Sequence, residues 1–321
     1  MTENKWLPYY KPLADPKLRL FAFHWAGGSA SSYNGVAWQA LPDGVELLAV
    51  QLPGREKRDG ETTPKTAQAA AKQAVGELKR FFAAGSVPTA IFAHSMGTWV
   101  AFEFVRELRR QKLVAPKLMV VSNLAAPQTE ESSRPWRRNA ALTENQFKDE
   151  CRAWGVNEIV MKPNFWKNYH LPFRRDFTIF DEYVYEDGEP LETAVVAFLS
   201  GGDPRITKDL MMPWASQTKY ARSFEVVDFQ GDHFYVQDRK LVTAVVSKLA
   251  EYLKKTRDGA FPPQLEPAEE EGAGGDFLEE DIVRKINLLE ILEEDYPDVD
   301  PPPEDCVENW TEAQIRAHFS A

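Results

Sequence analysis

The sequence predicts a protein of the α/β class, in which a mostly parallel sheet carries helices on both faces. Six short apolar runs have the length and composition of buried strands. Segments with helical spacing of apolar residues lie between most of these runs, and such alternation is typical of parallel sheets. We expect strands near residues 18–23, 45–50, 89–93, 117–122, 194–199 and 223–229, and helices near 65–84, 97–111, 208–220 and 239–255.

The junction between the third expected strand and its following helix contains the most informative motif. The apolar run Thr89–Ala93 leads into Ala93-His94-Ser95-Met96-Gly97, and helical spacing of apolar residues follows. A sharp strand-to-helix turn at a serine is the nucleophile elbow of an α/β-hydrolase, and small residues must flank that serine. The turn would expose the Ser95 hydroxyl at a helix N-terminus, where the Met96 N–H can face a developing oxyanion. The motif alone occurs in many unrelated proteins and is therefore a weak indication. Its position between an expected strand and an expected helix makes the interpretation as a nucleophile elbow stronger.

An acid and a base follow Ser95 in the chain order of α/β-hydrolases. Asp203 lies just beyond the expected strand 194–199, and His233 lies on the loop after the expected strand 223–229. Parallel strands bring such loops to one edge of the sheet, where these folds collect their chemistry. Asp232 also neighbours His233, but adjacent residues on extended backbone point in opposite directions. We therefore expect Asp203 to orient His233.

A second oxyanion donor should come from the loop after the first expected strand. Leu18–Phe23 is followed at once by His24-Trp25-Ala26-Gly27-Gly28-Ser29. The paired glycines allow backbone N–H groups to point inward, so Ala26 is the candidate donor and Trp25 a candidate substrate-binding neighbour. The alternative is that the glycine pair forms an ordinary tight turn.

Several motifs together give the chain a family resemblance. These are residues 23–33, the Gln51-Leu52-Pro53-Gly54-Arg55-Glu56 run, the serine elbow, Arg174–Phe177, Tyr183–Tyr185, Gly202–Pro204 and Gly231–Phe234. Over about residues 5–255 the sequence resembles the type II thioesterases, stand-alone editing hydrolases of polyketide, non-ribosomal peptide and fatty acid synthesis. The resemblance implies Ser95 as nucleophile, His233 as base, Asp203 as its partner, and the Met96 and Ala26 N–H groups as oxyanion donors.

The resemblance also implies a substrate and a partner: an acyl group on the phosphopantetheine arm of an acyl or peptidyl carrier protein. Two positions depart from the family pattern. Trp25 stands where the family has a loop histidine, with His24 one place earlier, and Ala93 replaces the first elbow glycine. Neither change removes a reacting atom, but the first alters the mouth of the expected site.

The interval between the fourth and fifth expected strands is long, aromatic and basic. We interpret residues 128–185 as a helical lid, a common insertion at this point of α/β-hydrolases. Its aromatic residues, among them Trp154 and Phe165, are candidate substrate-binding residues. The alternative is that these aromatic side chains form the small core of an ordinary helical excursion.

Composition excludes several other classes of function. No run approaches the roughly 20 apolar residues of a membrane span, and Met1–Trp6 lacks the apolar core of a signal peptide. Cys151 and Cys306 are far apart and indicate reduced thiols, so we expect a cytoplasmic protein. No metal-ligand spacing and no phosphate-binding glycine loop is present, which favours an enzyme without metal or cofactor and without a nucleic-acid or membrane partner.

The C-terminal part differs sharply from the rest. Residues 258–321 contain 19 acidic and 3 basic residues, a net charge of −16, which leaves +5 for residues 1–257. We expect two parts: an α/β-hydrolase thioesterase domain over 1–257, and an acidic linker with short helices over 258–321. Helical spacing within 278–289 and capping-box spacing at 311–314 mark the two short helices. The tail is either a solvated segment or a docking element for the basic domain or for a synthase.

The sequence therefore predicts a serine thioesterase that hydrolyses acyl groups from carrier proteins. Two other functions remain open: a carboxylesterase or lipase that uses the same residues on free esters, and a non-catalytic carrier-binding module.

Overall fold

The computed structural model describes residues 4–262, 299, 302–303 and 312–319. The chain divides into two units, Met1–Gln264 and Leu265–Ala321. In the second unit the described helix is α10 (Glu312–Phe319), which overlaps the expected capping box. The helix expected within 278–289 lies outside the described residues.

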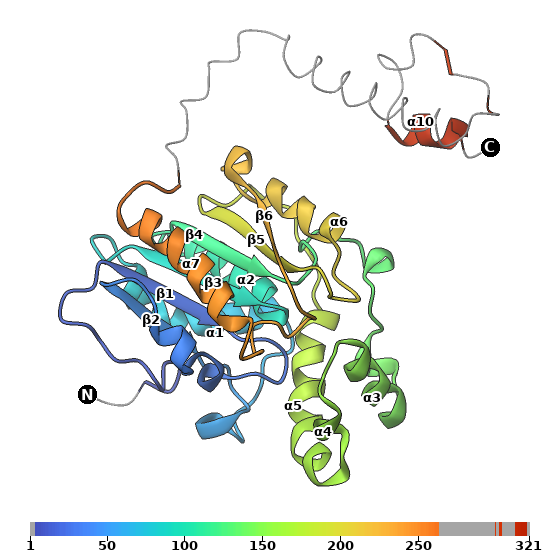
Figure 1. Cartoon of the computed structure of the whole chain (residues 1–321), viewed down its shortest axis with the longest axis horizontal. Helices are drawn as coiled ribbons and strands as arrows, with labels where there is room; N and C mark the ends of the chain where they lie inside the picture. The colour runs from blue at the N-terminus through green and yellow to red at the C-terminus, as the bar shows by residue number, and fades with distance from the viewer. Residues whose placement is uncertain (1–3, 263–298, 300–301, 304–311, 320–321) are drawn as a thin grey trace. The chain divides into compact units, whose positions relative to one another are not determined.

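The first unit is built on six parallel strands, as the sequence predicts (Figure 1). All five neighbouring strand pairs are parallel, and the order across the sheet is β2-β1-β3-β4-β5-β6. The strands are β1 (Leu18–Phe23), β2 (Val45–Val50), β3 (Thr89–His94), β4 (Leu118–Ser122), β5 (Ala194–Ser200) and β6 (Val226–Phe229).

This order places a topological switch point between β1 and β3. The chain moves from β1 outward to β2, then returns to form β3 on the other side of β1. The loops that leave the carboxyl ends of β1 and β3 therefore diverge and open a crevice, which is where ligands bind in such sheets. The expected oxyanion loop and the serine elbow are these two loops.

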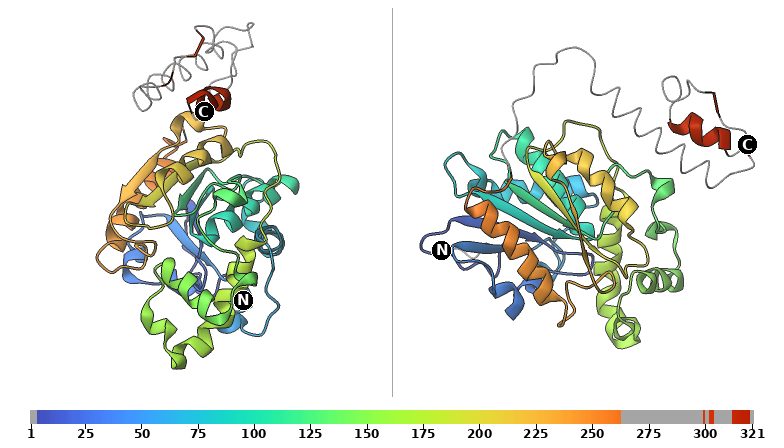
Figure 2. Two further views of the ribbon diagram at one scale, coloured as in Figure 1. Left: turned by 90° about the vertical axis from the view of Figure 1, so that its right-hand side faces the viewer. Right: turned by 45° about the horizontal axis from the view of Figure 1, so that its top comes forward.

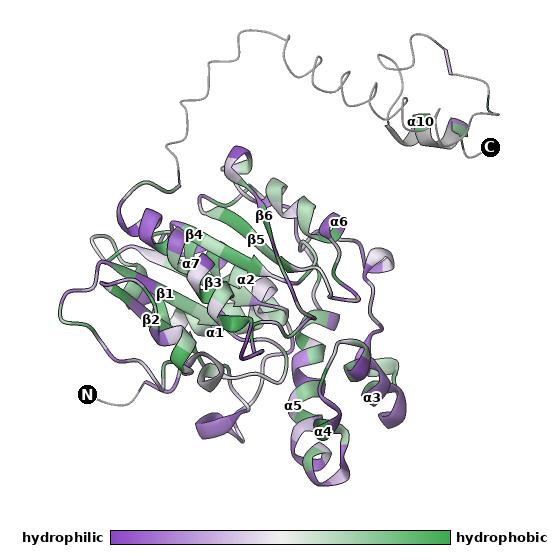
Figure 3. Cartoon of the chain, viewed as in Figure 1, coloured by the Kyte–Doolittle hydropathy of each residue, from purple (hydrophilic) through white to green (hydrophobic). Residues whose placement is uncertain are grey.

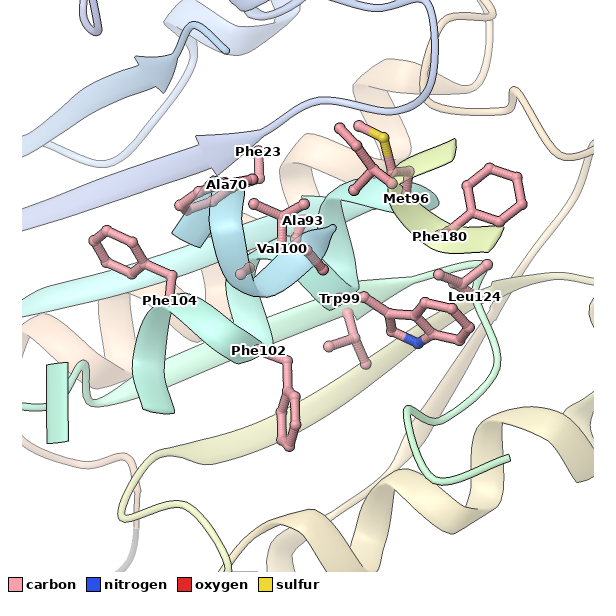
Figure 4. Packing of buried hydrophobic residues seen from close by; sticks show 14 of the residues in the cluster. Phe23, Ala70, Ala93, Met96, Trp99, Val100, Phe102, Phe104, Leu124 and Phe180 are labelled. Atoms are coloured by element: carbon pink, nitrogen blue, oxygen red, sulfur yellow. The ribbon is translucent and has the colours of Figure 1, made fainter. Parts of the chain in front are cut away.

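Each strand alternates its side chains between two apolar layers, because both faces of the sheet are covered. Phe21 and Phe23 of β1 pack with helices α1 (Ala67–Leu78) and α2 (Met96–Arg110). Leu20 and Ala22 pack on the opposite face with α7 (Val242–Arg257). Figure 4 shows the first layer around α2, and Figure 3 shows the strands as predominantly hydrophobic.

Two expected helices are shorter than predicted. Residues 65–84 form α1, capped by Thr66, and then a 3-10 turn over Lys79–Phe82. Residues 208–220 form only α6 (Lys208–Met211), followed by a 3-10 helix over Met212–Gln217. Pro213 lies at this change, and proline lacks the N–H that would continue the α-helical hydrogen-bond pattern.

The interval that we interpret as a lid is helical. It contains α3 (Glu144–Ala153), α4 (Glu158–Met161) and α5 (Pro163–Asp181), joined by short loops. These helices, green to yellow-green in Figures 1 and 2, lie beyond one end of the sheet. The Gly27 N–H, in the loop after β1, donates a hydrogen bond to Asp176 on α5, which shows that this is the end where the parallel strands finish.

Candidate active site

Ser95 occupies the strained turn that the sequence predicts. It follows β3 directly and precedes α2, with φ of 52° and ψ of −133°. A positive φ is costly for a residue with a side chain, so the surrounding structure must hold it. One such restraint is the Ser95 N–H, which donates to the Ser122 carbonyl at 2.8 Å.

The glycine of the elbow is required by a close approach of two backbone segments. A Cβ on Gly97 would lie 2.6 Å from the carbonyl oxygens of both Phe23 and His24. Helix α2 can therefore begin beside the end of β1 only if residue 97 has no side chain. Ala93 is fully buried, and its methyl group is accommodated where the family pattern has glycine.

Three residues from three strand ends form a continuous hydrogen-bonded chain. The Ser95 hydroxyl lies 2.8 Å from Nε2 of His233, and Nδ1 of His233 lies 2.6 Å from Oδ2 of Asp203. All three side chains are buried. With Nδ1 protonated and held by a carboxylate, Nε2 is free to accept the Ser95 proton.

Asp203 is held as a carboxylate by the hydrogen bonds around it. Burial alone would raise its pKa, but the hydrogen bond and charge of His233 and the N–H groups of Arg205 and Ile206 bring the pKa below the usual value. Asn123 Nδ2 adds a fourth donor at 2.8 Å.

Asp232, the sequence alternative, makes a different contact. Its carboxylate accepts the Phe234 N–H at 2.8 Å and closes the local turn.

The two candidate oxyanion donors lie at the same pocket. Met96 is the first residue of α2, and Ala26 lines the pocket together with Ser95. Neither backbone N–H has an acceptor among the described residues. Both groups are thus available to a developing oxyanion, with the positive end of the α2 dipole behind Met96.

The pocket at Ser95 is apolar and small. Its free volume is about 10 Å³, enough for one water molecule, and it opens beside a wider cavity of about 390 Å³. The two cavities share Ala26, Val156, Phe173 and Phe234. The pocket is lined by Ala26, Ser95, Leu124, Trp154, Val156, Phe173, Phe177, Phe180, His233 and Phe234.

The three candidate substrate-binding residues have different positions. Trp154 lines the pocket, and its ring lies 4.7 Å from the His233 ring. Trp25 lines the wider cavity and packs edge-on against Tyr33. Phe165 is 46% exposed on α5 and lies outside the pocket lining. The structure therefore brings Trp154 to Ser95 but does not bring Phe165 there.

Comparison with known proteins decides the family. Residues 18–253 match the family model described as Thioesterase domain. The chain belongs to this thioesterase family. The fold class and the thioester-hydrolase activity expected from the sequence are thereby confirmed.

Curated relatives of this thioesterase include a gramicidin S biosynthesis protein and a second thioesterase. The gramicidin S biosynthesis protein GrsT of Aneurinibacillus migulanus is 32% identical over 240 residues, which are 74% of this chain and 90% of that protein. Thioesterase PikA5 of Streptomyces venezuelae is 29% identical over 236 residues, 73% of this chain and 81% of that protein.

Solved structures show the same fold. The RedJ thioesterase of the prodiginine pathway in Streptomyces coelicolor is 26% identical and has a TM-score of 0.65, covering 77% of this chain and 92% of its own. The type II thioesterase BorB of the borrelidin cluster is also 26% identical, with a TM-score of 0.63 and coverage of 77% and 94%.

Sequence reasoning missed two polar residues that support the thioesterase site. Asn123 bridges β4 and β5, since its amide donates to Asp203 and accepts the Ser200 N–H at 2.9 Å. His94 lies behind His233, with ring centroids 5.2 Å apart, and its Nδ1 is 2.7 Å from the Ser122 hydroxyl. Asn123 follows a buried strand directly, and this polar residue at a carboxyl end was the signal that could have revealed it.

Within the described residues, no group of side chains has the arrangement of a metal site. Among those residues, too, no helix is both long and apolar enough to cross a membrane.

His24 should make the thioesterase less stable in acid. Burial, followed by the charge of Arg55, lowers the pKa of His24 to about 4. Between pH 6.5 and 4 the unfolded chain therefore binds a proton at this position that the folded chain does not, so the free energy of unfolding falls as the pH is lowered. The shift corresponds to a loss of roughly 3 kcal/mol in the free energy of unfolding.

Denaturant titrations at pH 7 and pH 4 measure this loss. The free energy of unfolding should fall less between the two pH values in His24→Gln than in the unmodified protein. Equal losses in both proteins would contradict the assignment.

Proposed function

We propose that this thioesterase removes acyl groups from the phosphopantetheine arm of an acyl or peptidyl carrier protein, in editing or release during polyketide, non-ribosomal peptide or fatty acid synthesis. The hydrogen-bonded chain Ser95–His233–Asp203 beneath an apolar pocket is the observation that carries the proposal. The proteins named above support the choice of substrate, because they include a gramicidin S biosynthesis protein and thioesterases of the prodiginine pathway and the borrelidin cluster.

In the proposed reaction His233 Nε2 takes the Ser95 proton while the serine oxygen bonds to the thioester carbonyl carbon. The Met96 and Ala26 N–H groups bind the resulting oxyanion. The carbon–sulfur bond then breaks, and His233 returns the proton to the leaving thiol. Water, activated by the same histidine, attacks the acyl-serine, releases the acid and restores Ser95.

The two adjoining cavities suggest how the substrate is divided between them. The small pocket is lined by side chains such as Leu124 and Phe177, whose apolar surfaces suit an acyl group, and it would have to widen from its volume of about 10 Å³ to hold one. The wider cavity includes the polar residues Asn157, Asp232 and Gln237, which suit the amides of a pantetheine arm. The arm would enter through the wider cavity and deliver its thioester to Ser95.

The test compares three substrates that contain the same acyl group. Acyl-carrier protein, acyl-pantetheine and the matching simple ester are each incubated with the protein, and released acid is measured. We expect kcat/KM for the carrier-bound thioester to exceed that for the ester by about tenfold or more. Equal values would indicate a carboxylesterase, and absence of turnover on all three substrates would indicate a binding module without catalysis.

The lid should set the acyl chain length. Phe177 and Phe165 lie on the same helix, but Phe177 lines the small pocket at Ser95 whereas Phe165 is exposed. Phe177→Ala should enlarge the pocket and raise the ratio of kcat/KM for long against short acyl groups by about tenfold. The matched variant Phe165→Ala should leave this ratio unchanged. If the ratio does not change in Phe177→Ala, the pocket does not hold the acyl chain.

We also propose that the acidic segment competes with the carrier protein for the basic catalytic unit. Its charge of −16 against +5 for residues 1–257 is the motivating observation, and tethering gives the segment a high effective concentration. Truncation after Arg257, which removes this whole segment, should lower KM for acyl-carrier protein at low salt and leave KM for acyl-pantetheine unchanged. The effect should shrink as salt is raised, because salt screens exposed charges. A higher KM for the carrier substrate would instead assign the segment to synthase recruitment.

A further inference from the structure

A buried ion pair joins three segments that are far apart in the sequence. Arg55, in the loop after β2, makes two hydrogen bonds to Asp176 on α5, with N–O distances of 2.7 and 2.5 Å. Asp176 is fully buried and Arg55 is 8% exposed. Asp176 Oδ2 also accepts the N–H of Gly27, in the loop after β1, at 2.7 Å. One carboxylate of the lid therefore holds the loop that carries Ala26.

Arg55 holds the same loop from a second direction. Its Nη1 donates to the Gly28 carbonyl at 3.0 Å. Asp176 thus restrains the N–H of the Ala26–Gly27 peptide, and Arg55 restrains the carbonyl of the Gly28–Ser29 peptide. The guanidinium group donates in a fixed planar arrangement, so it determines orientation as well as distance.

His24 restrains the peptide group that contains the candidate oxyanion donor. The Trp25 carbonyl lies 2.9 Å from His24 Nδ1 and accepts the Gly28 N–H at 3.0 Å. In a trans peptide the C=O and N–H point in opposite directions. Anchoring the Trp25 carbonyl therefore directs the Ala26 N–H to the other side, where the pocket with Ser95 lies.

Helix α5 also contacts this loop through Phe173, three residues before Asp176. Gly27 has φ of +76°, and a Cβ at this position would lie 2.4 Å from the Phe173 ring. The loop is therefore packed directly against the helix, with no room for a side chain between them. A shift of α5 away from the sheet would break the Asp176 contact and remove the Phe173 contact together.

We propose that Asp176 and Arg55 are positioning residues that make the oxyanion hole depend on the lid: the Ala26 N–H takes its working orientation only while α5 is packed on the loop after β1. This inference rests on the proposed function, because it assumes that Ser95 is the nucleophile and Ala26 an oxyanion donor. Lid closure then completes the hydrogen-bond donors as well as covering the acyl group. An acyl chain that holds the lid open would reach Ser95 while the oxyanion hole is incomplete.

The experiment measures kcat and KM for an acyl-pantetheine, and the inhibition constant of an alkylboronic acid, which forms a tetrahedral adduct with a serine. In Asp176→Asn we expect kcat to fall about 100-fold and KM to change less than about threefold. The inhibition constant of the boronic acid should rise by about the same factor as kcat falls. Arg55→Lys, which keeps the charge but loses the planar double contact, should show the same pattern more weakly.

A matched control comes from another buried pair. Arg19 Nε lies 2.8 Å from Glu46 Oε2, and the Glu46 side chain is buried. Neither residue lines the pocket at Ser95. Glu46→Gln should lower the melting temperature yet leave kcat and boronic acid affinity unchanged. If Glu46→Gln loses kcat as Asp176→Asn does, the effect is general destabilisation and the proposal is wrong.

Asp176→Asn alone leaves Arg55 buried without a counter-charge, which threatens folding. The double variant Arg55→Gln/Asp176→Asn removes both charges. We expect the double variant to recover the melting temperature but not kcat. The proposal would be overturned if the double variant recovered both. It would also be overturned if kcat of Asp176→Asn lay within threefold of the value for the unmodified protein. Ser95→Ala serves as the reference: if it stays active, the proposed function fails, whereas an inactive Ser95→Ala beside an active Asp176→Asn refutes the positioning role alone.

Discussion

Ser95→Ala is expected to lower thioester hydrolysis by on the order of 10³-fold or more, and His233→Ala should fall to nearly the same residual rate. The Ser95 hydroxyl lies 2.8 Å from His233 Nε2, so in the proposed mechanism the two residues act as one nucleophilic unit. Either substitution removes the attacking alkoxide, so the double variant should be no slower than the slower single variant.

The measurement is the rate of acid release from acyl-carrier protein at saturating and at low substrate. Ser133→Ala, a substitution of an exposed lid serine, provides the control and should keep full activity. Ser95→Ala should also keep the melting temperature and the affinity for the carrier protein. Substantial turnover by Ser95→Ala would show that the nucleophile lies elsewhere.

Asp203→Asn should cost on the order of 10³- to 10⁴-fold in kcat, as for the corresponding change in a serine protease. The asparagine amide would donate to His233 Nδ1, which moves the ring proton to Nε2. His233 would then face Ser95 with a donor instead of an acceptor and could not take the serine proton. The 2.6 Å contact between Asp203 and Nδ1 is the geometry that makes this outcome specific.

Asp232→Asn is the paired comparison, because Asp232 is adjacent to His233 in sequence. Its carboxylate accepts a hydrogen bond from the Phe234 N–H. After substitution by asparagine, the side-chain amide oxygen can still accept this hydrogen bond. We therefore expect kcat within a few-fold of the unmodified protein, measured with the same acyl-carrier substrate. A larger loss for Asp232→Asn than for Asp203→Asn would contradict the geometry.

The parallel sheet and the positions of Ser95, Asp203 and His233 could be predicted because each depends on local pattern and chain order. Apolar runs mark the buried strands, and a polar residue just after such a run must lie at the carboxyl edge. The choice of Asp203 over Asp232 followed from the alternation of side chains along extended backbone. These inferences need no knowledge of which loop contacts which helix.

The lining of the pocket could not be predicted in the same way. Phe165 and Phe173 are both aromatic residues of α5, yet Phe165 is exposed whereas Phe173 is buried against Gly27. Which side faces Ser95 depends on the rotation of α5 about its axis, and the contacts that hold α5 include one between Asp176 and Arg55, 121 residues away in sequence. Long-range contacts of this kind leave no local signal in the sequence.

The strand order has a consequence for how activity arises during synthesis. From β3 to β6 the strands follow one another across the sheet in the order in which the ribosome makes them, so each new strand can add to an edge that already exists. Ser95 is translated early, whereas Asp203 and His233 come more than 100 residues later. In the proposed mechanism, Ser95 is an ordinary unreactive hydroxyl until His233 has been added. On that mechanism, a nascent chain or one terminated before His233 would not cleave the thioesters around it, and hydrolysis would begin only when β6 and the loop that follows it are in place.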